Sequence, residues 1–138
     1  MNTKIIVDGK GAVLGRLGSF VAKDLLKGGS VDIINSEEVI VSGRKEVIAE
    51  KIKAKRDMGT GGSLKGPKYI RQSDRLLKRM IRGMLPRTKA RGREAFKRLK
   101  CYIGNGEFKE DELKNVVVLK HKVPLKFTTV KEIVRALK

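Results

Sequence analysis

Two short apolar runs that flank a helical segment restrict the fold more than any other feature of the sequence. Residues 5–7 read Ile-Ile-Val, which is typical of a buried strand, and residues 31–34 form a second run of this kind. Between them, apolar residues recur on one helix face from about 13 to 27, and two glycines follow. A strand, a helix and a strand in this order predict a βαβ unit with parallel strands and a right-handed crossover. The chain is therefore expected to have an α/β fold.

Shorter patterns predict the other elements of the chain. Further strands are expected at residues 39–41, 101–103 and 116–119. Ser42 can cap a helix over residues 44–56 whose apolar side includes Val47, and Thr129 with Glu132 fits the capping box of a last helix. Because no linker interrupts these elements, we expect one domain over residues 1–138.

Positive charge is concentrated in residues 65–100. This segment contains fourteen Lys or Arg and two acidic residues, so it carries +12 of the formal net charge of +18. Such a concentration creates a local potential that attracts polyanions. Acidic residues are too few to pair with the cations, which would repel one another at helical spacing. We therefore expect a polyanion-binding surface, and not the solvated face that most runs of charge form.

The spacing within this segment predicts a folded surface. From Ser73 to Leu85, apolar residues recur along one side of a helix and cations along another. Ser73 is expected as the N-cap and Pro86 as the stop, since proline pushes the preceding residue out of the helical region. Phe96 and its apolar neighbours indicate a second helix. The glycine-rich residues 57–72 have no such period, so a loop that orders on binding is expected there.

A glycine-rich turn after the first strand raises a different function, that of a small nucleotide-dependent enzyme. Gly9, Gly11 and Gly15 lie where a phosphate can bind a helix N-terminus, and Glu37 or Glu38 lies near the distance for a ribose-binding acid. The spacing is G-x-G-x-x-x-G, however, and no G-K-[ST] motif is present. A tight βα turn with close packing is the favoured interpretation, and the enzyme stays an alternative.

Other catalytic chemistry has less support. His121 is the only histidine and stands between two lysines, which favours a surface residue or a phosphate contact. The single Cys101 has apolar neighbours, so it is expected to be a small core residue and not a reactive thiol. No Cys/His cluster has metal spacing. We therefore expect no catalytic residue, no metal, no cofactor and no small-molecule substrate.

Composition indicates which polyanion is bound. Aromatic residues make up 4% of the chain, too few for the stacking platform of a single-strand reader, so contacts to phosphates and shape are expected. No helix-turn-helix or zinc-finger signature indicates operator DNA. No apolar run approaches the ~20 residues of a membrane span, and the start lacks a signal-peptide hydrophobic region, so the chain is expected in the cytosol. Peripheral binding to an anionic membrane through the stripe of residues 76–85 remains an alternative.

Several motifs then resemble one known family, ribosomal protein L13 of the large subunit. The central part has I-R-G-M-L-P at residues 81–86, G-R-x-A-F-K-R-L-K at 92–100, Tyr102, and Gly104-Asn105. The first part has V-D-G at 7–9, L-G-R-L at 14–17, V-A-K at 21–23 and V-S-G-R-K at 41–45. The glycine loop, the run G-P-K-Y-I-R-Q-S at 66–73 and the short C-terminal part resemble the archaeal type.

The resemblance implies a three-layer α/β/α fold with a mainly parallel four-stranded sheet, extended by basic helices and loops. It also implies a structural constituent of the large ribosomal subunit without catalytic activity. Such a protein binds 23S rRNA, contacts neighbouring large-subunit proteins, supports early subunit assembly and translation, and needs no membrane and no obligate homo-oligomer.

The candidate site combines the charge pattern with these motifs. The candidate rRNA-binding residues are Arg44, Lys45, Lys65, Lys68, Arg71, Arg75, Lys78, Arg79, Arg82, Arg87, Lys89, Arg91, Arg93, Lys97, Arg98, Lys100, Lys120 and Lys122. Gly83, Met84, Leu85 and Pro86 are interpreted as a structural corner that orients the two basic segments against RNA.

Overall fold

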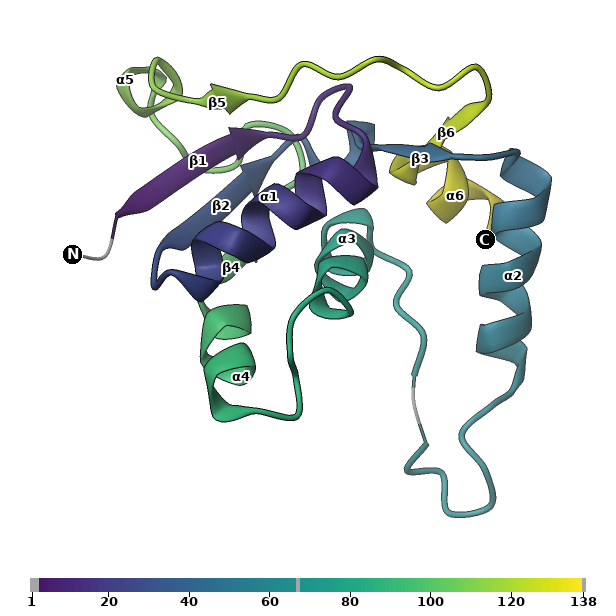
Figure 1. The fold of residues 1–138 in the computed structure, drawn as a ribbon. Coiled ribbons are helices and arrows are strands. Elements are labelled where there is room, and N and C mark those ends of the chain that lie inside the picture. The colour runs from purple at the N-terminus through teal and green to yellow at the C-terminus, as the bar shows by residue number, and fades with distance from the viewer. Residues whose placement is uncertain (1–2, 67, 138) are drawn as a thin grey trace.

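A four-stranded parallel sheet forms the centre of the structure, a computed structural model that describes residues 3–66 and 68–137 (Figure 1). The strand order is β4-β2-β1-β5, and every pairing is parallel. The strands are β1 (Lys4–Asp8), β2 (Ser30–Ile34), β4 (Leu99–Cys101) and β5 (Val117–Val118). In β1 and β2, Val7 is opposite Ile33. The predicted α/β fold with its parallel βαβ start is therefore confirmed.

Helices cover one face of this sheet. They are α1 (Leu14–Leu26), α3 (Ser73–Arg82) and α4 (Ala90–Lys97). Leu17 of α1, Leu77 of α3 and Ala95 of α4 are fully buried in one core together with Val7 and Val31 of the sheet. Because side chains alternate along a strand, this helical layer collects the apolar residues of one sheet face.

The segment around the short helix α5 (Glu110–Leu113) provides the layer on the other face. Phe108 packs edge-to-face on Tyr102 with ring centroids 5.1 Å apart, and the Lys4 ammonium lies 5.2 Å from the Phe108 ring centroid. Lys4 also pairs with the buried Asp32, so this face is polar. The arrangement is consistent with the three-layer α/β/α fold.

A second, two-stranded sheet lies beside the first. β3 (Ile40–Ser42) pairs antiparallel with β6 (Phe127–Thr129), so the strand predicted at 39–41 does not join the parallel sheet. The remaining elements are the 3-10 turn η1 (Ser36–Glu38), α2 (Lys45–Asp57) and α6 (Val130–Ala136). Figure 1 shows α2 and α4 at different sides of the molecule, joined by the long loop and α3.

Several predicted element ends differ from the structure. Gln72 occupies the N-cap position of α3 and Arg44 that of α2, without side-chain cap bonds, so Ser73 and Ser42 are not the caps. Val47 is 46% exposed, so it does not lie on the buried side of α2. Ile52, which is 7% exposed, does. The strand predicted at 101–103 runs two residues earlier, as Leu99–Cys101, and Tyr102 directly after it donates its N–H to the Ile33 carbonyl of β2 at 2.8 Å.

The capping box of the last helix is confirmed. Glu132 donates its N–H to Thr129 Oγ1 at 3.3 Å, and Thr129 donates its N–H to Glu132 Oε2 at 3.0 Å. The box starts α6 directly after β6, which turns the buried Val130 and Ile133 toward the core.

Candidate nucleic-acid interface

Helix α3 separates apolar residues from cations. Leu76, Leu77 and Ile81 are fully buried, which leaves the opposite side of the helix for Arg75 and Arg79. The apolar stripe therefore belongs to the core, and it is not available for the lipid contact that the sequence left open. Asp74 stands in the first turn, where a carboxylate suits the positive end of the helix dipole.

A tight connection fixes α3 relative to its neighbours. The helix ends at Arg82, earlier than Pro86 alone requires, and residues 83–86 lead toward α4. A Cβ on Gly18 of α1 would collide with the Met84 side chain, and a Cβ on Gly92 of α4 would collide with the Pro86 carbonyl. The two glycines allow the connection to approach both helices closely, so α1, α3 and α4 are packed in a defined geometry.

Two hollows on either side of Phe96 bring predicted site residues together. The first is lined by Arg82, Leu85, Arg87, Gly92, Arg93, Phe96 and Lys97. The second is lined by Ile70, Arg75, Lys78, Arg79, Arg82 and Phe96. The cations that line them, Arg75, Lys78, Arg79, Arg82, Arg87, Arg93 and Lys97, are called the α3–α4 surface below. They come from three parts of the sequence, and the fold gathers them around one aromatic ring.

Within the described residues, no cation of the α3–α4 surface forms an ion pair. Across residues 3–66 and 68–137, five ion pairs form, and none includes a cation of this surface. Burial, together with the neighbouring cations Arg87 and Arg79, lowers the pKa of Arg82. A guanidinium stays charged at neutral pH, so these cations repel one another. The arrangement favours binding of an anion from outside the chain.

Aromatic rings hold two of these cations in place. The Arg79 guanidinium lies 4.6 Å from the Tyr69 ring centroid, and its Nη1 donates to the Lys68 carbonyl at 3.1 Å. The Lys78 ammonium lies 5.0 Å from the Phe96 ring centroid. Cation–π contacts of this kind orient a charge without neutralising it.

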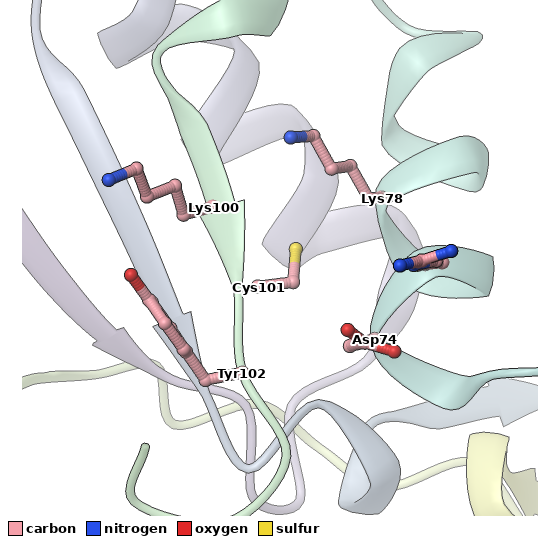
Figure 2. A pocket seen from close by; sticks show the side chains of 6 residues that line it. Asp74, Lys78, Lys100, Cys101 and Tyr102 are labelled. Carbon is pink, nitrogen blue, oxygen red and sulfur yellow. The ribbon is translucent and has the colours of Figure 1, made fainter. Parts of the chain in front are cut away.

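A third hollow lies between α3 and the edge strand β4, as Figure 2 shows. Asp74, Arg75, Lys78, Lys100, Cys101 and Tyr102 line it. Cys101 points from β4 toward α3, whereas Lys100 and Tyr102 lie on the other side of the strand (Figure 2). Burial raises the pKa of Cys101 to about 12, so its thiol stays protonated near neutral pH, as expected for a small core residue.

Some predicted site arginines bind the chain itself. Arg98 donates from Nη2 to the Leu25 carbonyl at 2.7 Å and from Nε to the Gly29 carbonyl at 3.0 Å. Arg91 donates to the Leu26 carbonyl at 3.1 Å. The Leu25 and Leu26 carbonyls lie at the C-terminal end of α1, where backbone acceptors have no partner within the helix, and Gly29 lies in the connection to β2 that follows. Arg98 and Arg91 therefore cap α1, and RNA binding by them stays a prediction.

Other predicted site residues lie away from the α3–α4 surface. Arg44 and Lys45 line a separate hollow at the start of α2, next to Lys126. Lys120 and Lys122 belong to the extended segment between β5 and β6, which runs on the far side of the sheet from α4 (Figure 1). Lys65, Lys68, Arg71 and Lys89 are exposed in loops. The fold therefore divides the predicted set among several surfaces.

The glycine turn after β1 is occupied by internal contacts. Gly9 donates its N–H to the Ile34 carbonyl at 2.9 Å, and Gly11 donates to the Glu38 carbonyl at 3.3 Å. Both Glu37 carboxylate oxygens accept from the Gly104 N–H, at 3.0 and 3.1 Å. These backbone donors and this carboxylate cannot hold a phosphate and a ribose at the same time. The interpretation as a tight βα turn with close packing is confirmed.

Phe96 packs against the core and also lines the two basic hollows. Its ring is only partly buried. Lys78 and Phe96 lie eighteen positions apart on different helices, α3 and α4, so no local pattern in the sequence indicates their contact. Within the described residues, no three His, Cys, Asp or Glu side chains gather as metal ligands, and no helix has the length and apolar character needed to cross a membrane.

The chain matches a known protein family over most of its length. The profile of the family described as ribosomal protein L13 matches residues 2–107. Helices α3 and α4, the connection between them and the strands β1, β2 and β4 all lie within this range.

Similar proteins occur in archaea and are named large ribosomal subunit protein uL13. The protein of Methanopyrus kandleri is 46% identical over 77% of this chain and 65% of its own length. That of Methanocaldococcus jannaschii is 44% identical over 72% of this chain and 74% of its own length. That of Haloarcula marismortui is 38% identical over 94% of this chain and 87% of its own length.

Proposed function

The chain belongs to the ribosomal protein L13 family as an archaeal-type member, and from that premise we propose that it binds 23S rRNA through the α3–α4 surface. Proteins of this family are structural components and not enzymes. The observation that carries the proposal is the cluster of cations without ion-pair partners among the described residues. RNA phosphates would supply the missing counter-charge and release counterions.

The fold supports this proposal by keeping the cations in place. The buried side of α3 and the close contacts of Gly18 and Gly92 fix the helices that carry the charges. A fixed array of cations matches phosphates whose positions are set by a folded RNA, which is recognition by shape. We further propose that this contact supports early assembly of the large subunit in the cytoplasm, and that neighbouring subunit proteins pack on the acidic segment of residues 107–112.

Charge reversal on two surfaces tests the proposal. A variant with Arg79, Arg82 and Arg87 changed to Glu is compared with a matched variant in which Lys51, Lys53 and Lys55 of α2 are changed to Glu. Both variants change the net charge equally, and all the changed α2 lysines are exposed. Binding to a large-subunit rRNA transcript is measured by filter retention, and circular dichroism checks folding. We expect at least a hundredfold loss for the first variant and a much smaller loss for the second. Equal losses would reduce the proposal to a non-specific charge effect, and unchanged affinity of the first variant would overturn it.

A further inference from the structure

The hollow between the end of α3 and α4, called the α3–α4 hollow below, has the composition of a nucleotide site. Its cavity volume is about 270 Å³. Small-molecule sites begin at ~300 Å³, so this hollow suits one planar group and not a whole cofactor. Leu85 and Phe96 give it an apolar part, while Arg82, Arg87, Arg93 and Lys97 surround that part with charge. A nucleotide likewise combines a flat apolar ring with an anionic phosphate.

The charges around this hollow differ from those of the neighbouring hollow in Figure 2. The hollow between α3 and β4 contains the Asp74 carboxylate, which repels a phosphate. Among the described residues that line the α3–α4 hollow there is no acidic side chain. A backbone phosphate is therefore attracted to the rim of the α3–α4 hollow more strongly than to the hollow beside β4.

The Phe96 ring is accessible for stacking with a base. It is partly exposed, and the Lys78 ammonium lies over it on the side of the second hollow. Lys78 is not one of the described residues that line the α3–α4 hollow, and among the described residues it is the one cation in cation–π contact with Phe96. Bases stack on aromatic rings of RNA-binding proteins when they are unpaired and turned out of the helix.

We infer that the α3–α4 hollow takes one unstacked base of the RNA, with the base on Leu85 and Phe96 and its phosphate among Arg82, Arg87, Arg93 and Lys97. The inference rests on the proposed RNA-binding function and adds a base contact to what would otherwise be binding by shape alone. The chain is poor in aromatic residues, so a single ring supplies this contact. The RNA at this point would have to carry a bulge or a loop, because a paired base cannot enter.

Two RNA hairpins of equal length and charge test the inference, one fully paired and one with a single bulged 2-aminopurine. The full-length protein should bind the bulged hairpin more tightly by about 5- to 150-fold, the range expected for one base stacked on an aromatic ring. Stacking should also quench the 2-aminopurine fluorescence. Phe96→Leu keeps an apolar side chain and should abolish both effects. Because it also removes the cation–π contact with Lys78, affinity for the paired hairpin should fall by about 2- to 5-fold, as for an exposed cation–π contact.

Phe108→Leu is the matched control. Phe108 is also partly buried and also lies under a lysine ammonium, but on the other face of the sheet. It should keep the preference for the bulge and the quenching. If Phe96→Leu fails to fold, the wild-type protein alone decides the test: tighter binding of the bulged hairpin together with quenching supports the base site, and the lack of either overturns it.

The outcomes separate this inference from the proposed function. Equal affinity of the wild-type protein for the two hairpins, or quenching that survives Phe96→Leu, overturns the base site and leaves phosphate binding intact. Failure to bind both hairpins, with the rRNA transcript still bound, overturns the base site alone. Failure to bind the transcript as well overturns the proposed function.

Discussion

Cations on the α5 side of the sheet and cations of the α3–α4 surface differ in their partners. On the α5 side, Lys4 Nζ lies 3.1 Å from Asp32 Oδ2, and Lys114 Nζ lies 2.8 Å from Asp111 Oδ1. On the other side, the cations of the α3–α4 surface form no ion pair with the described residues. Paired cations stabilise the folded state. Unpaired cations repel one another and raise the free energy of the folded state until an external anion binds. Stability and RNA binding should therefore respond to different substitutions.

The largest expected effect concerns the scaffold of the α3–α4 surface. Gly92→Ala forces a Cβ against the Pro86 carbonyl, which is backbone and cannot turn away. We expect the free energy of unfolding to fall by about 3 kcal/mol, the upper part of the range for overpacking. Urea denaturation measures it. Gly15→Ala in α1 is the control, since a Cβ there meets no atom within 4 Å and should change stability by less than about 1 kcal/mol. Equal stability of the two variants would show that the connection is not tightly packed.

Two arginines of the same basic segment should separate stability from binding. Arg98→Ala removes charge-assisted hydrogen bonds to Leu25 and Gly29, so unfolding should become easier by about 2 kcal/mol. Arg82→Ala removes a cation that its neighbours repel, so stability should stay equal or rise. RNA titrations at several salt concentrations give the second measurement.

For those titrations, Arg82→Ala should reduce the slope of log affinity against log salt by ~0.7–0.9, the loss of one phosphate contact. Arg98→Ala should leave the slope nearly unchanged. The reverse pattern would mean that the guanidinium of Arg98 leaves α1 for RNA, and the division between paired and unpaired cations would then fail within this segment.

A smaller effect is expected on the paired side. Lys4→Met leaves the buried Asp32 carboxylate without its partner, and we expect a loss of about 1 kcal/mol, since the Lys4 side chain is 56% exposed and solvent weakens the pair. The hydrogen bond and charge of Asp32 raise the pKa of Lys4. This contribution to stability is therefore complete below the ordinary lysine pKa of ~10.4 and disappears as pH rises through the higher folded value.

Urea unfolding between pH 7 and 11 measures this dependence. The difference between wild type and Lys4→Met should be constant up to about pH 10 and shrink above it. RNA affinity should be nearly equal for the two proteins, because Lys4→Met removes only one positive charge and that charge is not part of the α3–α4 surface. A difference that grows with pH would contradict the assigned sign, and a large loss of RNA affinity would place Lys4 in the interface.

The fold was predictable to a greater extent than the site. Apolar runs and helical periods act locally, so they identified β1, α1, β2 and the cationic side of α3 from the sequence. The pairing of β3 with β6 joins residues far apart in the chain, and no local period signals it. For the same reason, the sequence does not distinguish the roles of individual arginines. Arg98 and Arg82 look alike in the sequence, and only packing shows that one caps α1 while the other meets further cations.

The smallest expected effect tests whether orientation of a cation matters as well as its charge. The Tyr69 ring holds the Arg79 guanidinium at 4.6 Å, at the end of the long loop that precedes α3. Tyr69→Leu removes the ring and keeps every charge, so RNA affinity should fall by about 2- to 5-fold, the equivalent of ~0.5–1 kcal/mol for an exposed cation–π contact. Tyr69→Phe keeps the ring and should bind as the wild type does. Since neither variant changes the number of cations, the salt slope should stay the same in both. A reduced slope in Tyr69→Leu would mean that Arg79 loses its phosphate altogether, and loss of affinity in Tyr69→Phe would mean that the Tyr69 hydroxyl itself contacts RNA.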